Sequence, residues 1–316
     1  MKRMLILASV CLLALFAFTS CEKPSMSEAT EEEESGGVVN GDIQVRFRIA
    51  QIEQVPFEDA TEGTRSTPIS ELCQRISFGV YQNGKMLKTV HEQVGDEHFG
   101  QVTLSLAAGS YQVVIVAHNG EENAQINNPE AVTFKESNHL KVTDTFYYYD
   151  TIEVTEDCSV DVKMKRAVAM VKFMMKDTIP AGVEKLRFYY TGGSSTLDAT
   201  TGKGCVSSKQ TEFRDVTEEM IGKPGVFYFY TFPHETEGKL KLTITAYNKN
   251  SNIVQEKSFE NVPVTRNQIT QYTGYFFTDD PGDEPSDTIS GGNEANGNAA
   301  FLLMTDDEWN LKELTF

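Results

Sequence analysis

The side chain with the clearest chemistry is the thiol of Cys21, because of the residues that precede it. The cationic start Met1–Arg3 is followed by an apolar run, residues 4–18, that is short for a bilayer-spanning helix. The small residues Thr19 and Ser20 then lead directly to the cysteine. This order predicts a secretory signal over residues 1–20, whose removal leaves Cys21 as the lipid-modified first residue of the mature chain.

A second candidate for chemistry is the peptide bond between Arg65 and Ser66. It lies in the polar stretch Thr64–Thr67, after the first predicted strand, where a trypsin-like protease would have access. An exposed arginine in a loop is also ordinary. Both alternatives, a processing site and a plain surface residue, stay open.

Other chemistry-bearing residues do not form a pattern. The five histidines lack metal-ligand spacing, and the glycines of 192–195 and 202–204 are better explained as turns than as phosphate loops. We therefore expect no enzyme activity, no metal and no cofactor. Three cysteines remain after Cys11 and Cys21 are set aside, and they are far apart: Cys73, Cys158 and Cys205. We expect buried free thiols, although one disulfide is possible.

The elements that hold these residues read as strands. Residues 43–49 alternate apolar and polar side chains, and Asn83-Gly84 separates two apolar runs as a type I′ hairpin turn would. Some seven short strands precede Arg166, and a second run of strands follows it. This predicts an all-β fold of two tandem antiparallel β-sandwiches, residues 41–165 and 166–278.

Three segments outside the predicted sandwiches differ in composition. Residues 21–40 are acidic and poor in core residues, which predicts a disordered tether, and residues 279–298 read as a flexible acidic linker. The C-terminal segment 299–316 becomes apolar again, and its apolar residues are Phe301, Leu302, Leu303, Met304 and Trp309. We expect this segment to dock on its own protein or on another. Closure of its own sheet and a short helix, capped by Thr305 and Glu308, are the alternatives.

Two aromatic runs, Phe146–Tyr149 and Phe227–Tyr230, place alternate rings on opposite faces of a strand. They fit core strands, and they also fit stacking platforms for sugars. The formal net charge of −18 argues against a nucleic-acid partner. Three Asp-Thr-Ile triplets, at residues 150, 177 and 287, look like O-glycosylation acceptors of gut and oral anaerobes, with chance composition as the alternative.

The N-terminal signal resembles that of bacterial lipoproteins, although Phe18 stands where Leu is usual. The resemblance implies lipid, including palmitate, on Cys21, and Glu22 is compatible with transfer to the outer membrane. The acidic run Glu31–Glu34 resembles surface-export signals, with a solvated charge cluster as the alternative. We therefore expect a lipid-anchored protein of the outer membrane, exposed at the cell surface.

The whole arrangement resembles the fimbrillin superfamily of type V pilus proteins, closest to the anchor and minor-subunit lipoproteins associated with fimbrillin A. The motifs that carry the resemblance are Arg166–Val171, Val262–Thr270 before Gly274, and Asp306–Trp309. The resemblance implies sandwiches of Greek-key, transthyretin-like topology and a fimbrial function in cell adhesion. It implies partners among other fimbrial subunits, with a host or bacterial surface ligand possible.

Subunits of this superfamily assemble by strand complementation, so residues 299–316 are the candidate donor strand. A cut after Arg65 would make the protein a shaft subunit, whereas the intact chain would be an anchor or accessory base subunit, which we favour. The alternative from another class is a surface glycan-binding lipoprotein. It requires a solvent-exposed, coplanar pair among Tyr147, Tyr149, Tyr228 and Tyr230.

Overall fold

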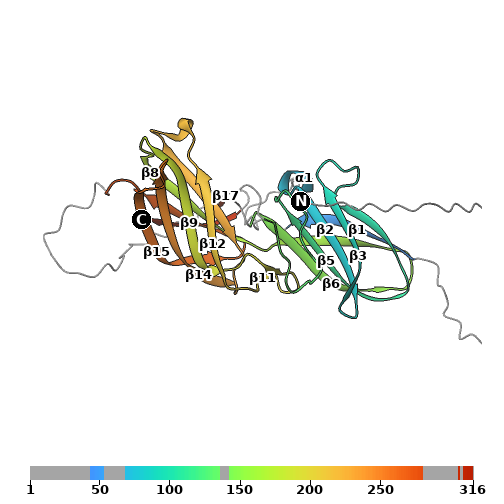
Figure 1. Ribbon diagram of the computed structural model, residues 1–316. Helices are drawn as coiled ribbons and strands as arrows, with labels where there is room; N and C mark the ends of the chain where they lie inside the picture. The colour runs from blue at the N-terminus through green and yellow to red at the C-terminus, as the bar shows by residue number, and fades with distance from the viewer. Residues whose placement is uncertain (1–42, 53–67, 136–141, 280–304, 307–308, 316) are drawn as a thin grey trace, which may run out of the picture. The chain divides into compact units, whose positions relative to one another are not determined.

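The computed structural model describes residues 43–52, 68–135, 142–279, 305–306 and 309–315 (Figure 1). Within these ranges the only helical elements are α1 (Ile69–Leu72) and a 3-10 turn, η1 (Glu218–Met220). All other regular elements are strands, so the all-β prediction is confirmed. None of the described helices is long or apolar enough to cross a bilayer.

The first half of the described chain forms one seven-stranded sheet in the order β3-β2-β5-β6-β7-β1-β4. Its strands are β1 (Ile43–Ile52), β2 (Arg75–Gln82), β3 (Lys85–Gln93), β4 (Gln101–Leu106), β5 (Gly109–His118), β6 (Thr145–Val154) and β7 (Cys158–Arg166). The predicted hairpin is confirmed between β2 and β3, since Asn83 and Gly84 both have positive φ, 52° and 72°.

One apolar cluster fills this half and takes residues from both ends of the sheet. Strands β6 and β7 pair only at Phe146↔Arg166 and Tyr147↔Lys165, so the sheet has two wings, β3-β2-β5-β6 and β7-β1-β4. Buried side chains of both wings meet in the cluster, among them Phe47 of β1, Phe78 of β2 and Ile115 of β5.

The second half contains a four-stranded sheet, β12-β9-β14-β15, and a five-stranded sheet, β13-β8-β16-β18-β17. The strands are β8 (Ala169–Thr178), β9 (Val183–Gly193), β12 (Ser208–Asp215), β13 (Pro224–Thr231), β14 (Glu237–Asn248), β15 (Ile253–Thr265), β16 (Gln268–Gly274), β17 (Thr305–Asp306) and β18 (Trp309–Thr315). A short pair, β10 (Leu197–Asp198) and β11 (Lys203–Gly204), lies apart from both sheets. Phe173, Phe188 and Phe229 belong to one core cluster that both sheets contribute to.

The prediction of purely antiparallel sheets is wrong at three pairs. Strand β1 is parallel to β7, β16 is parallel to β8, and β18 is parallel to β16. The reason is that alternation of apolar and polar residues identifies a strand and its buried face but not the direction of its neighbour. The tandem-sandwich arrangement with Greek-key topology, and the division between residues 165 and 166, stay predictions.

A third apolar cluster connects the two halves. It contains Val116 and Val132 of the first half with Leu197, Phe232 and Ile269 of the second. Within this cluster, the backbone amides of Val132 and Leu197 each donate to the carbonyl of the other residue, at 2.7 and 2.9 Å. The halves are therefore connected by packed side chains as well as by the chain itself.

Candidate functional site

Strand β1 lies inside the first sheet, between β4 and β7. It pairs with β4 from Ile43↔Leu106 to Arg48↔Gln101 and with β7 from Val45↔Cys158 to Ile52↔Met164. The side chains of Val45 and Phe47 are fully buried. Loss of β1 would therefore leave two unpaired strand edges with an apolar slot between them.

The residues predicted to decide whether β1 is kept or cleaved off lie outside the described residues. Arg65 and Ser66 fall in residues 53–67, between the end of β1 and Pro68, which precedes α1. Cys21 also lies outside the described part of the chain. In the sequence, Cys21 and β1 are on the same side of Arg65, so both would leave together after a cut there.

The C-terminal segment ends in a strand that pairs with its own chain. Strand β18 is parallel to β16 over six residue pairs, from Gln268↔Asn310 to Thr273↔Thr315. Its Trp309 pairs with Asp306 of β17. The alternative of a short helix, capped by Thr305 and Glu308, is wrong because Asp306 is in β17 and Trp309–Thr315 form β18. Phe301, Leu302, Leu303 and Met304 lie outside the described residues.

After β16 the chain continues through residues 276–278, whose backbone is hydrogen-bonded by side chains of two other strands. The buried carboxylate of Asp177, at the end of β8, accepts backbone hydrogen bonds from Phe276 (3.0 Å), Phe277 and Thr278 (2.9 Å). From β15, Gln255 Nε2 donates to the Phe276 carbonyl at 2.9 Å. The start of the acidic linker is thus fixed to the second half by its neighbours.

This role of Asp177 was not predicted. The sequence shows it as the first residue of an Asp-Thr-Ile triplet, and its partners lie about 100 residues further along the chain. Its carboxylate is committed to backbone amides, so the triplet at 177 has a structural explanation. In the triplet at 150, Asp150 and Thr151 lie on the exposed part of β6.

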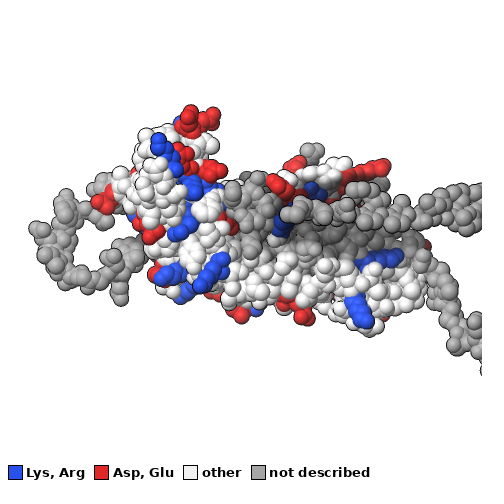
Figure 2. Space-filling model, in the orientation of Figure 1, with Lys and Arg blue, Asp and Glu red and all other residues white. Residues whose placement is uncertain are grey.

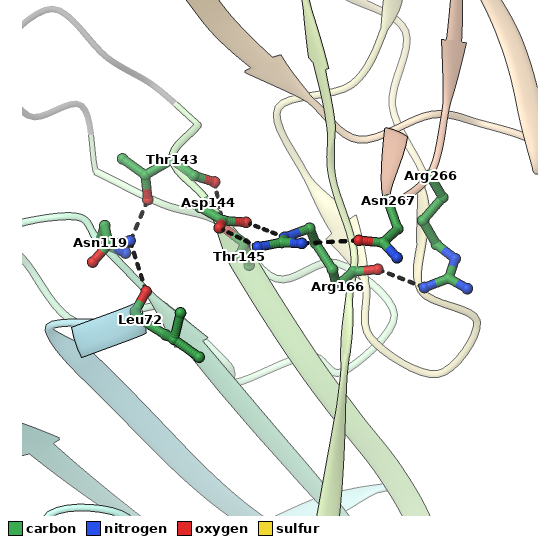
Figure 3. Close-up of polar contacts among 8 residues, drawn as sticks. All are labelled: Leu72, Asn119, Thr143, Asp144, Thr145, Arg166, Arg266 and Asn267. Atoms are coloured by element: carbon green, nitrogen blue, oxygen red, sulfur yellow. Dashed lines mark hydrogen bonds and ion pairs between the residues drawn. The ribbon is translucent and has the colours of Figure 1, made fainter. Parts of the chain in front are cut away.

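A buried arginine joins the two halves where β7 ends (Figure 3). The Arg166 side chain is 1% exposed, and its Nε and Nη2 donate to the two carboxylate oxygens of Asp144 at 2.9 Å. Its Nη1 donates to Asn267 Oδ1, also at 2.9 Å, and the guanidinium carbon lies 4.9 Å from the ring centre of Phe146. Such a forked pair fixes direction as well as distance.

Two further hydrogen bonds connect the second half to backbone carbonyls at the same point. Arg266 Nη1 donates to the Arg166 carbonyl at 2.6 Å (Figure 3). The Asn267 backbone amide donates to the Val168 carbonyl at 2.9 Å. Asn267 has a φ of 59°, in the left-handed region that asparagine tolerates better than most residues. The turn between β15 and β16 is therefore locked onto the junction between β7 and β8.

The buried hydroxyl of Tyr190 lies in a second polar network, between the edge strands of the two sheets in the second half. Its oxygen is 2.8 Å from Gln210 Oε1 and 2.9 Å from Glu212 Oε1, and Arg214 Nη2 donates to Glu212 and to the Tyr228 carbonyl, each at 2.8 Å. Burial, reinforced by the Glu212 charge, raises the pKa of Tyr190 well above its usual value. The network ties β12 to β13.

The aromatic runs fit the core alternative better than sugar platforms. Phe146, Phe227 and Phe229 are buried, and Tyr147 is 8% exposed. The exposed Tyr228 meets Tyr230 with ring centres 5.8 Å apart and planes at 75°. That pair is edge-to-face, and a flat platform needs coplanar rings.

The three cysteines in the described part of the chain are free and differ in exposure. Cys73 is buried, Cys158 is half-buried and Cys205 is exposed, so the expectation of buried thiols is right for Cys73 and wrong for Cys205. Burial, with a smaller contribution from the charge of Asp144, raises the pKa of Cys73 to about 12. Among the described residues, no group of three or more His, Cys, Asp or Glu side chains could hold a metal ion.

Several solved structures are similar at low identity. A candidate adhesin from Bacteroides ovatus is 15% identical, with a TM-score of 0.47, 69% of this chain and 82% of that chain being covered. A candidate polysaccharide-binding protein from Bacteroides thetaiotaomicron is 12% identical, with a TM-score of 0.47 and coverage of 70% and 80%. The fimbrial anchor protein Mfa2 from Porphyromonas gingivalis is 12% identical, with a TM-score of 0.41 and coverage of 68% and 81%. At these TM-scores and identities, nothing about the function of this chain follows.

The sequence itself gives the family. No curated protein matches it. The model of one family, described as a family of unknown function (DUF6562), matches residues 38–300, which is most of the chain. The protein belongs to that family.

Proposed function

We propose that the protein is a structural subunit of a cell-surface fimbria, held at the outer membrane by lipid on Cys21, and that it acts as an anchor or accessory base subunit. The observation that carries the proposal is the place of β1. It fills an internal position of the sheet, between β4 and β7, and it is followed directly by the segment that contains Arg65. A strand with this position and this neighbour can be kept or removed as a unit.

The intact chain has its own slot filled. With the Arg65–Ser66 bond uncut, both edges of β1 are paired and Val45 and Phe47 occupy the core. A neighbouring subunit then finds no open position there. Such a chain joins a filament by donating a strand, and it stays attached to its lipid because Cys21 precedes β1 in the same uncut chain.

The donor in this proposal is the segment 299–316. Its described strand, β18, lies next to the sheet edge, paired with β16 on one side and with two residues of β17 on the other. The contacts of Asp177 and Gln255 fix residues 276–278 upstream of the linker. Release of β18 would therefore leave the exit of the linker in place. We further propose that the two halves are tandem sandwiches, since a cluster in each half takes side chains from both of its layers.

The test is the intact mass and N-terminal peptide of the protein in filaments sheared from cells. A lipidated Cys21 with an uncut Arg65–Ser66 bond is expected for an anchor or base subunit. An N-terminus at Ser66 would refute that role and identify a polymerised shaft or tip subunit. Absence from every filament fraction would refute both roles and favour a glycan-binding lipoprotein.

A matched pair of variants separates processing from degradation. Arg65→Ala should abolish any fragment that begins at Ser66, whereas Arg46→Ala, which changes an exposed arginine in the middle of β1, should leave such a fragment unchanged. A fragment that persists in the first variant would show that Arg65 does not direct the cut.

A further inference from the structure

The outer face of the four-stranded sheet carries a line of basic side chains. Lys185 and Arg187 on β9 and Lys239 and Lys241 on β14 alternate with buried core residues, so they point away from the core. Lys209 of β12 is exposed and pairs with β9 at Thr191. Figure 2 shows Lys and Arg side chains over this part of the molecule. The same face also carries four carboxylates, those of Asp215 opposite Lys185, Glu237, Glu256 and Glu260, so five cations face four acidic side chains.

Aromatic rings contact the two cations of β9, Lys185 and Arg187. Lys185 Nζ lies 5.3 Å from the ring centre of Phe213 and 5.9 Å from that of Tyr247. The guanidinium carbon of Arg187 lies 5.7 Å from the ring centre of Tyr247 and 6.0 Å from that of Tyr189. These contacts limit the rotamers of the two cations, so an anion that binds them loses less side-chain entropy.

Part of the charge is already balanced by β15. Arg187 Nη2 is 3.9 Å from Glu256, and Lys241 pairs with Glu260. In the part of the chain that the structure describes, no carboxylate forms an ion pair with Lys185, Lys209 or Lys239. Each of these three lysines could therefore form an ion pair with a further carboxylate.

The acidic linker leaves the fold at one end of this face. Thr278 is held at Asp177, near the turn from β8 into β9, and Lys185 is the third residue of β9. At the same end, Lys185 pairs with Tyr247 on β14. The linker therefore starts at the same end of the strands as Lys185.

The chain is described again, at β17 and β18, at the opposite end of the second half. Strand β18 is parallel to β16 and begins beside Gln268, at the start of β16, whereas the linker follows the end of β16. At that far end Lys239 on β14 pairs with Pro263 of β15, close to the turn into β16. The basic line thus runs in the direction that the linker has to travel.

We propose that the acidic segment 279–298 of the same chain binds this face, with its carboxylates on Lys185, Lys209 and Lys239. The segment has six acidic residues and no Lys or Arg; the acidic residues are Asp279, Asp280, Asp283, Glu284, Asp287 and Glu294. As a coil its 20 residues span about 25 Å. The six-residue step from Lys185 to Thr191 on β9 covers about 20 Å, so the lengths match. The contact directs the C-terminal strand toward the edge of β16, and it does not depend on the fimbrial role.

The experiment measures cleavage of the full mature chain by a Glu-specific protease at Glu284 and Glu294, by mass spectrometry. In wild type we expect slow cleavage at low salt and faster cleavage at about 1 M salt, where charges are screened within about 3 Å. The variant K185Q/K209Q/K239Q should be cleaved about threefold to tenfold faster at low salt. The control K85Q/K163Q/K165Q removes the same charge from exposed lysines of β3 and β7 and should change the rate less than twofold.

Zero-length carbodiimide crosslinking of the wild-type chain gives an independent readout that needs no variant. Links from residues 279–298 to Lys185, Lys209 or Lys239 within one molecule are expected. Cleavage at equal rates in wild type and in the first variant, with no effect of salt, would overturn the proposal. Links from Glu31–Glu34, or links that form only between copies, would overturn it as well and would identify a different occupant.

Discussion

Replacement of Asp144 by alanine should cost about 3–5 kcal/mol of unfolding free energy. The change removes both oxygens that receive the Arg166 guanidinium, at 2.9 Å each, while the arginine stays 1% exposed. Removal of one partner from a buried ion pair leaves a buried charge that has lost its counter-charge, and the loss is typically of this size. The Asn267 amide oxygen, 2.9 Å from Nη1, carries only a partial charge in compensation.

The assay is urea unfolding of the single variants D144A and R166M and of the double variant. If the pair acts as a unit, the double variant should cost about as much as the worse single variant, with a coupling energy of roughly 1.5 kcal/mol or more. The matched control is the exposed pair of Arg48 and Asp161, whose side chains are 56% and 58% exposed. R48M should cost less than about 1 kcal/mol because solvent screens such pairs.

Additive losses, or a D144A cost as small as that of R48M, would refute the reasoning. Either result would mean that the guanidinium is stabilised by its other contacts. A lower m value, the slope of unfolding free energy against urea concentration, would give separate information on the two halves. It would show that the two halves no longer unfold together, as expected if Arg166, Asp144 and Asn267 couple them.

Three further outcomes are expected from urea unfolding and hydrogen exchange. Phe47→Ala should cost about 3–5 kcal/mol by leaving a cavity under β1, while Arg46→Ala on its exposed side should stay within about 0.5 kcal/mol. Asp177→Ala should cost about 2–4 kcal/mol and speed amide exchange at residues 276–278, and unchanged exchange there would contradict the assignment. Burial lowers the pKa of His118 to about 4, so between about pH 6.5 and pH 4 the unfolded chain binds a proton that the folded chain does not bind. The free energy of unfolding should therefore fall by up to about 3 kcal/mol as pH drops through this range. A His118→Gln variant should lack this part of the pH dependence.

Much of the fold could be predicted because its signals are local. Alternation in residues 43–49 gives β1 and its buried face, and Asn83-Gly84 gives the first hairpin, since each depends on neighbours in sequence. The parallel partners could not be predicted this way. Val45 faces Cys158 across more than 100 residues, and a period of two is the same for both strand directions.

The polar contacts of Arg166 and Asp177 could not be predicted for the same reason, because their partners are distant in the sequence. Arg166 and Asn267 each lie in a motif that carries the resemblance, but nothing in the sequence predicted that they contact each other or that Asp144 is the ion-pair partner of Arg166. Asp177 looked like part of a triplet, and its backbone partners carry no side-chain signature. A side chain that binds backbone amides leaves no pattern in the sequence of its partner.

In the proposed function, two opposing free energies decide whether the C-terminal strand stays on its own chain or is donated. In its own chain β18 has six residue pairs with β16 along one edge and only two with β17 along the other, whereas β1 has six with β4 and seven with β7. At about 1 kcal/mol net per hydrogen bond, a slot that pairs both edges offers several kcal/mol more than an edge position. Against this, the covalent linker gives β18 an effective concentration in the millimolar range at β16, which favours closure by about 4 kcal/mol over a free neighbouring subunit at about 1 μM. Donation is therefore favoured when a neighbour offers an empty two-sided slot, and closure onto β16 is favoured when every slot, including that of β1, is filled.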